Sequence, residues 1–172
     1  MKLHVYTGDG KGKTTAALGL ALRSLGHGHS VLFAQFMKDG TSGELSALAT
    51  FPTAVVRIAP VSGFSFHMTQ EEKAACALKQ TAFAHLLENE IRQLHPQLII
   101  LDELNCALSS GFVSETDGKH LIHAALSVGE TVVTGRNAPA YVMDMADYIS
   151  VIQAVRHPYA TQQLPAREGI EY

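Results

Sequence analysis

Cysteine is scarce in this sequence. Its two cysteines, Cys76 and Cys106, form neither a CxxC pair nor another metal-binding spacing. This pattern argues against a zinc site and against a disulfide framework, and it agrees with a reducing compartment. We therefore expect both side chains to be buried or chemically inert thiols.

Long apolar runs and an excess of charge are also missing. No apolar run approaches the roughly 18 residues that a membrane-spanning helix needs, and the chain begins directly on strand-like residues without a signal-peptide pattern. The 13 basic and 16 acidic side chains give a net charge of −3, which provides no general attraction to nucleic acid or to anionic membranes. The sequence therefore predicts a cytoplasmic protein with neither a nucleic-acid nor a membrane partner.

Segments with strand character alternate with segments with helical character along the chain. The 172 residues, 47% of them hydrophobic, suit one domain spanning residues 1–172. A capping-box pattern at Thr69 and Glu72 begins the longest expected helix, and Pro96 follows its end. Strands are expected at 3–6, 31–36, 55–58, 98–101, 131–134 and 148–152, helices at 13–25, 70–94, 119–126 and 139–145, and irregular structure after Pro158. This alternation predicts an α/β fold of the P-loop, RecA-like type, with a mainly parallel sheet and helices on both faces.

A glycine-rich loop joins the first expected strand to the first expected helix. In such a loop, backbone N–H groups turn toward one anion, Lys13 can reach phosphate oxygens and the Thr14 hydroxyl can ligate Mg²⁺. The start of the helix adds its positive dipole end. Only three residues separate Gly8 from Gly12, so the loop is one residue shorter than a standard P-loop. The expected ATP-binding residues are Gly8, Asp9, Gly10, Lys11, Gly12, Lys13, Thr14 and Thr15.

Charged side chains end two further expected strands. Asp102 and Glu103 follow a buried strand, as in a Walker B segment. Because side chains alternate across a strand, we expect one of the two carboxylates to approach the Mg²⁺ shared with Thr14. Arg136 ends the next strand in the same way, where its guanidinium could hold a phosphate of ATP; an ordinary surface arginine is the alternative.

Phenylalanine and histidine side chains provide weaker signals. Phe64 and Phe66 lie in one loop and should pack against something, either a flat ligand or the protein core. His67 is interpreted as a hydrogen-bonding side chain rather than a metal ligand. His120 and His123 share a helix face, but they lack supporting carboxylates or cysteines and are expected at the solvated surface.

Six segments in the same order resemble the ATP:corrinoid adenosyltransferases. They are VYTGDGKGKTTAA (5–17), QFMK (35–38), LDELN (101–105), TGRNAP (134–139), RHPY (156–159) and AREGIEY (166–172). The resemblance runs from residue 3 to residue 172. In this family the short phosphate loop is associated with ATP lying in the reverse sense across the site.

The resemblance implies transfer of the 5′-deoxyadenosyl group of ATP to the Co(I) of a reduced corrinoid, in cobalamin biosynthesis or salvage. Inorganic triphosphate is the leaving group, and Co(I) is the nucleophile, which agrees with the absence of a Ser-His-Asp or Cys-His constellation. Lys13 and Glu103 are then the expected catalytic residues, with Mg²⁺ held by Thr14 and Glu103 together with Asp102.

A Gly-Phe-x-Trp segment of the family packs under the corrin ring and aids the reduction of cobalt. It maps onto residues 63–66, so that Phe64 and Phe66 are the expected corrinoid contacts and Phe66 replaces the tryptophan. The resemblance also implies a homodimer and a flavoprotein reductant.

Two other functions stay open at this point. One is a RecA-like P-loop kinase or ATPase, against which the short loop counts. The other is a non-catalytic corrinoid- or nucleotide-binding protein, which the change at Phe66 suggests. The sequence leaves the natural acceptor undecided among cobalamin, cobinamide and an earlier corrinoid.

Overall fold

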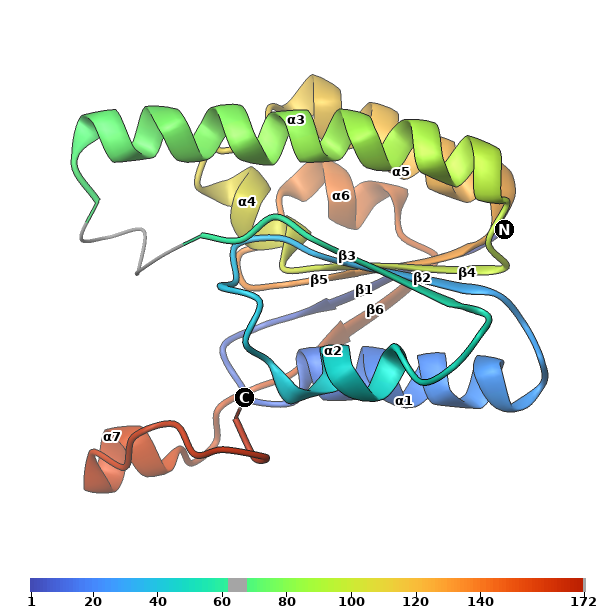
Figure 1. Ribbon diagram of the computed structural model, residues 1–172. Coiled ribbons are helices and arrows are strands. Elements are labelled where there is room, and N and C mark those ends of the chain that lie inside the picture. Colours follow the sequence, from blue (N-terminus) through green and yellow to red (C-terminus); the bar gives the residue numbers. More distant parts are fainter. Residues whose placement is uncertain (62–67, 172) are drawn as a thin grey trace.

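One parallel sheet organises the protein (Figure 1). The computed structural model describes residues 1–61 and 68–171, and within these residues six strands form a single sheet in the order β3-β2-β4-β5-β1-β6. Every strand pair is parallel. The strands are β1 (Leu3–Thr7), β2 (Val31–Gln35), β3 (Ala54–Ile58), β4 (Leu98–Asp102), β5 (Glu130–Thr134) and β6 (Tyr148–Val151). The expected α/β fold with a mainly parallel sheet is confirmed.

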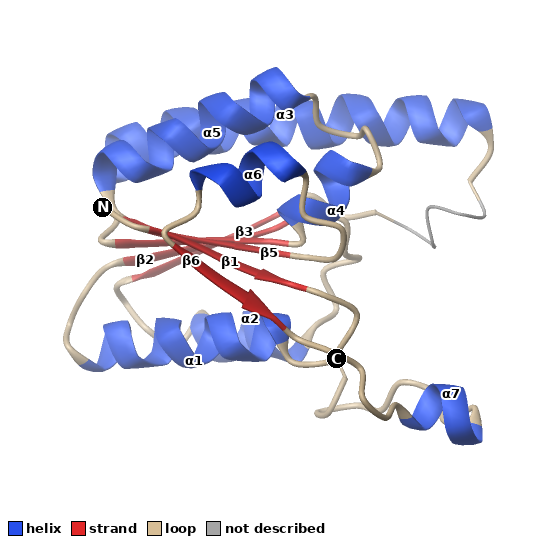
Figure 2. Ribbon diagram, turned by 180° about the vertical axis from the view of Figure 1, so that it is seen from behind, coloured by secondary structure: helices blue, strands red, loops and turns tan. Residues whose placement is uncertain are grey.

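Helices cover both faces of this sheet. In Figure 1, α3, α4, α5 and α6 lie above the strands and α1 and α2 below them, and the reverse view in Figure 2 shows the same two layers. The described helices are α1 (Lys13–Gly26), α2 (Gly43–Leu48), α3 (Gln70–Leu94), α4 (Leu104–Ser109), α5 (Glu115–Val128), α6 (Ala140–Met145) and α7 (Pro158–Gln162). α7 lies outside both layers (Figure 1).

The protein has one apolar core on each face of the sheet, because the central strands are apolar on both faces. All five residues of β2 and of β4 are buried. On one face Leu87 of α3 and Leu121 of α5 pack with Ile99, and on the other Ala17 and Ala21 of α1 pack with Phe33 and Ile100. Burial on both faces is typical of parallel strands with continuous apolar sequences.

The longest helix begins and ends where its sequence signals predict. The Thr69 side chain accepts a hydrogen bond from the Glu72 backbone, and the Glu72 carboxylate accepts one from the Thr69 backbone. At the other end His95 adopts a left-handed conformation with φ 49°, and Pro96 follows. The first turns of α3 project beyond the sheet (Figure 1).

Short helices account for most differences from the sequence-based expectations. α2 and α4 were not expected, since six residues are too few for an apolar period to stand out. α5 begins before residue 119 because Ser114 caps it by accepting a hydrogen bond from the Asp117 backbone. The expectation of an irregular tail was wrong for residues 158–162, where Pro158 occupies the first turn of α7 and His157 caps it.

Candidate functional site

The carboxyl ends of the parallel strands meet at one edge of the sheet, and a cavity of 930 Å³ opens there. The loops after β1, β2, β4 and β5 all contribute to it, as does the segment after β6. Ligands of open parallel sheets bind at this edge. The lining residues used below are Asp9, Lys11, Lys13, Thr14, Lys38, Glu44, Glu103, Cys106, Arg136, His157, Gly169 and Glu171.

The phosphate loop is pressed against the backbone that follows β6. A side chain at Gly8 would place its Cβ 2.5 Å from the carbonyl oxygen of Ile152, and one at Gly10 would lie 2.7 Å from the backbone of Gln153. The Gly10 N–H donates to the Ile152 carbonyl at 2.8 Å. Gly12, with φ 119°, turns the chain into α1. Each of these glycines therefore has a steric or conformational reason at its position.

Lys13 lies under the loop. Its ammonium group donates to the carbonyl oxygens of Gly8 at 2.7 Å and Gly10 at 2.8 Å. Burial lowers the pKa of Lys13, the charge of Glu103 opposes that effect, and the nearby positive charge of Arg136 adds to it. The ammonium group thus lies at the centre of the loop, with Glu103 and Arg136 in its electrostatic neighbourhood.

The carboxylate of Asp102, at the end of β4, has four polar partners among the described residues. It is fully buried. One carboxylate oxygen accepts hydrogen bonds from Thr14 at 2.9 Å and Thr134 at 2.6 Å. The other accepts from Gln35 at 3.1 Å and forms an ion pair with Lys38 at 3.0 Å.

Asp102 and Glu103 are adjacent in sequence but have different contacts. The carboxylate in contact with Thr14 is that of Asp102. Glu103 has a left-handed backbone with φ 59°, donates its N–H to the Thr134 hydroxyl at 3.1 Å and lines the cavity. The left-handed residue ends the strand and starts α4, which separates the two side chains.

The oxygen-rich surroundings of Asp102 fit a magnesium ion. Mg²⁺ prefers oxygen ligands and is usually held by one or two carboxylates together with substrate phosphates and water. Asp102 and the hydroxyl of Thr14 supply such oxygens, and beside them Oε1 of Gln35 is buried without a hydrogen-bond partner among the described residues. Within residues 1–61 and 68–171 no three His, Cys, Asp or Glu side chains form a closed metal cage, so water or phosphate oxygens would complete the coordination.

Arg136 is exposed and lines the same cavity. The turn that presents it is tight: Gly135 has φ 129°, and a Cβ there would lie 3.0 Å from the backbone nitrogen of Cys106. Cys106 accepts a hydrogen bond from the Arg136 N–H at 3.3 Å. Burial and the neighbouring Glu103 raise the pKa of Cys106 to about 12, which agrees with the expectation of an inert thiol.

The segment after β6 forms a wall of the cavity that the sequence did not predict. His157, Gly169 and Glu171 line it, and Glu171 forms an ion pair with Lys11 of the phosphate loop at 3.2 Å. Hydrogen bonds from Arg167 and the neighbouring Lys11 lower the pKa of Glu171 to about 2. The family-like segments at 156–159 and 166–172 were the available signal.

Gln35, Lys38, Glu44 and Thr134 are further site residues that sequence reasoning did not single out. Gln35 and Lys38 belong to a family-like segment at 35–38, which was the available signal for them. Burial lowers the pKa of Lys38, but the charge of Asp102 and then that of Glu44 outweigh this effect, so that the pKa is raised.

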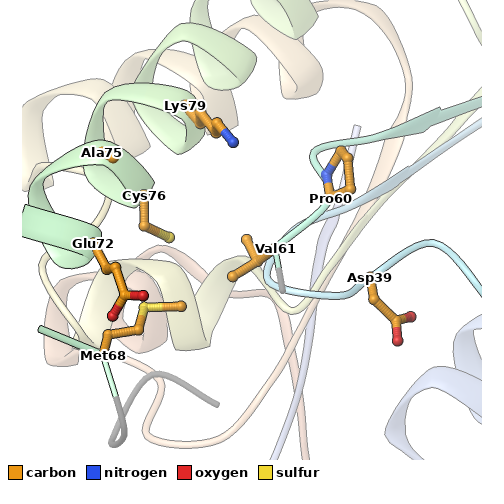
Figure 3. Close-up of a pocket in the computed structure, with 8 residues that line it drawn as sticks. All are labelled: Asp39, Pro60, Val61, Met68, Glu72, Ala75, Cys76 and Lys79. Carbon is orange, nitrogen blue, oxygen red and sulfur yellow. The ribbon is translucent and has the colours of Figure 1, made fainter. Parts of the chain in front are cut away.

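Phe64, Phe66 and His67 lie outside the described residues. A second cavity, of 320 Å³, is lined by Val61 and Met68, the described residues that flank residues 62–67 (Figure 3). Figure 3 shows Cys76 and Glu72 of α3 facing it from one side and Val61 from the other. Cys76 is buried there, and burial raises its pKa. His120 and His123 are exposed on α5, as expected.

No helix among the described residues combines the length and the apolar character that a membrane crossing requires.

Known proteins match this chain over nearly its full length. The family model for ATP:corrinoid adenosyltransferase BtuR/CobO/CobP matches residues 1–172. A corrinoid adenosyltransferase of Pseudomonas aeruginosa is 33% identical over 99% of this chain and 83% of its own length. Corrinoid adenosyltransferase CobA of Salmonella typhimurium is 31% identical and the corrinoid adenosyltransferase of Escherichia coli 29%, each over 98% of this chain and 84% of its own length. The chain therefore belongs to the ATP:corrinoid adenosyltransferase family.

Proposed function

We propose that this protein transfers the 5′-deoxyadenosyl group of ATP to the cobalt of a reduced corrinoid and releases inorganic triphosphate, in cobalamin biosynthesis or salvage. The observation that carries the proposal is the shortened phosphate loop, which centres Lys13 in a cavity shared with Thr14, Glu103 and Arg136, in a chain of this family. In the reaction, a cobalt–carbon bond forms at C5′ of the ribose. The bond from C5′ to the phosphate oxygen breaks, and its electron pair leaves with the triphosphate.

The protein contributes position and charge to this reaction. Lys13 and the N–H groups of residues 8–15 stabilise the charge that grows on the departing triphosphate, and Lys11 and Arg136 extend this positive surface. Holding cobalt in line with C5′ accounts for several kcal/mol of the barrier, toward the ~7 to 11 kcal/mol of well-oriented intramolecular reactions. Because the substrate's own metal attacks carbon, no side-chain nucleophile is required.

Thr14, Asp102 and Glu103 would hold Mg²⁺, since Thr14 contacts Asp102, which is buried at the strand end, and Glu103 lines the same cavity as Thr14. When bound, the ion supplies charge neutralisation for the phosphate oxygens. Glu103 also lines the cavity near Lys13, and its negative charge favours the charged form of that lysine by raising its pKa.

The corrinoid side of the site is proposed to include Phe64 and Phe66. Apolar packing under the ring would exclude a lower axial ligand from cobalt and so ease its reduction to Co(I). Phe66→Ala should then lose activity mainly when cobalt has to be reduced by a flavoprotein. Chemically prepared Co(I) should restore it; equal impairment with that substrate would contradict the proposed role.

The proposal includes a homodimer working in the cytoplasm with a flavoprotein reductant, as the family resemblance implies. Light scattering of the purified chain tests the dimer. A monomer at micromolar concentration would contradict it.

The direct test is an anaerobic incubation of the purified protein with ATP, Mg²⁺ and chemically reduced cobalamin or cobinamide. The absorbance of the cobalt–carbon product is followed, and the released phosphate is identified. Adenosylated corrinoid with triphosphate is the expected result. ADP and phosphate without alkylation would indicate an ATPase or kinase, and binding without product a carrier or sensor.

A further inference from the structure

Lys38 lies between two carboxylates at the floor of the main cavity. Its ammonium nitrogen is 3.0 Å from the carboxylate of Asp102 and 3.5 Å from that of Glu44. Asp102 is fully buried, whereas the Glu44 side chain is 17% exposed and faces the cavity. The loop between β2 and α2 therefore places one cation between a buried acid and a more accessible one.

Gln35 ties the two carboxylates together. Its side-chain amide donates to Glu44 and to Asp102, each at 3.1 Å. The two acids are thus held near each other by one neutral group, and the Lys38 ammonium group already lies within reach of both.

Lys38 differs in kind from the other partners of Asp102. Thr14 and Thr134 are hydroxyls, whose oxygens can turn lone pairs toward a metal, and Gln35 is neutral. An ammonium group has no lone pair and repels a divalent cation. Lys38 and a metal ion therefore compete for Asp102, while the threonines are compatible with both.

A buried carboxylate without a counter-ion is strongly destabilising. Lys38 provides the counter-ion of Asp102, beside the neutral donors Thr14, Thr134 and Gln35. Glu44 supplies an acceptor for the ammonium group after its displacement, so that the lysine is not left in the cavity without a counter-ion.

We propose that Lys38 is an exchangeable counter-ion of Asp102, which the divalent metal displaces toward Glu44 and the cavity, where its charge becomes available to the triphosphate. The inference rests on the magnesium site of the proposed function and adds a coupling to it. Four basic and four acidic side chains among the described residues line this cavity, and Lys11 and Lys38 are both ion-paired within the protein. A polyanion can gain the charge of Lys38 only when Asp102 has another partner, so metal and triphosphate assist each other.

The test measures Mn²⁺ binding by electron paramagnetic resonance, with the full chain and with neither nucleotide nor corrinoid. Lys38→Met should bind Mn²⁺ at least about tenfold more tightly than the unaltered protein, because the competing charge is gone. Lys11→Met is the matched control, since it removes the same charge from the same cavity without touching Asp102. It measures the general field effect, which should be clearly smaller. Equal or weaker Mn²⁺ binding by Lys38→Met than by Lys11→Met would overturn the proposal.

Lys38→Arg tests the proposal without a change of charge. A guanidinium group pairs with a carboxylate in a bidentate fashion and is harder to displace, so this variant should bind Mn²⁺ several-fold more weakly. If the methionine variant does not fold, this measurement alone decides, and unchanged or tighter Mn²⁺ binding would contradict the proposal. Thermal unfolding gives a second readout: Mg²⁺ without nucleotide should raise the Tm of Lys38→Met much more than that of the unaltered protein. None of these measurements requires adenosyl transfer, so they stand apart from the test of the enzymatic activity.

Discussion

Lys13 shows how one side chain can maintain the loop and serve the reaction. Its ammonium group bonds to the carbonyls of Gly8 and Gly10 while lying at the centre of the phosphate-binding cavity. We predict that Lys13→Ala lowers kcat with chemically reduced corrinoid by at least about 10²-fold, because a charge-stabilising donor is lost at the leaving group. Arg23→Ala, at the exposed far end of the same helix, is the control and should retain normal kcat. Full turnover by Lys13→Ala would remove this lysine from the mechanism.

Cys106 is close to the cavity but should be chemically quiet. With its pKa raised from 9.0 to about 12, its thiolate fraction near neutral pH is about 10³-fold smaller than that of an ordinary cysteine. We predict that iodoacetamide alkylates Cys106 very slowly in the folded protein and rapidly after unfolding in urea, as mass spectrometry can follow. Rapid alkylation of the native protein would show that the thiol is less protected than its contacts indicate.

At the scale of elements, a glycine of the phosphate loop and a glycine of α1 predict opposite outcomes. Gly10→Ala should destabilise the protein and weaken ATP binding, since its Cβ would lie 2.7 Å from the backbone of Gln153. Gly19→Ala should stabilise it by roughly 0.5–1 kcal/mol, because Gly19 is an exposed helical position with open space around it and alanine is the better helix former. Urea unfolding of both variants measures the change. A destabilised Gly19→Ala would mean that α1 has less space than the structure shows.

Much of this level of structure could be predicted from the sequence. The six strands and the long helix after Thr69 were anticipated, because continuous apolar runs and a capping box are local signals. α2 and α4 were not, because their six residues are held by their position after a strand end rather than by a period of their own. Glu103 illustrates the difference, since its left-handed backbone depends on tertiary contacts and no local sequence signal predicts it.

At the scale of the whole molecule, the C-terminal segment closes the site. Glu171 contacts Lys11 and Arg167, and its pKa is lowered from 4.5 to about 2. A depressed carboxyl pKa means that the contacts contribute above about pH 4.5 and are lost as the pH falls toward 2. We predict that the amide signal of Gly169 in an NMR titration shifts to that of a released segment in this window. Glu171→Gln should show the released signal already at neutral pH, and Glu168→Gln should not. A Gly169 signal that is the same in Glu171→Gln and in the unaltered protein would contradict the contact.

The sequence predicted those residues of the candidate site that belong to recognisable motifs, the phosphate loop and the charged ends of two strands. Lys13, Thr14, Asp102, Glu103 and Arg136 all reach the edge where the strands end, as expected. The remaining partners of Asp102 were not predicted, because Gln35, Lys38 and Thr134 come from the ends of two other strands. Their meeting depends on strand order: β4 lies between β2 and β5, and that order follows from packing of the complete sheet.

The contact between the phosphate loop and the segment after β6 has a consequence for how the protein is made. Residues 8 and 10 rest on residues 152 and 153, so the loop acquires its shape only when β6 has docked beside β1. A chain emerging from the ribosome would carry its nucleotide-binding motif early and remain unable to use it until β6 had been synthesised and had docked beside β1. Nucleotide binding would therefore report that the last strand of the sheet has docked.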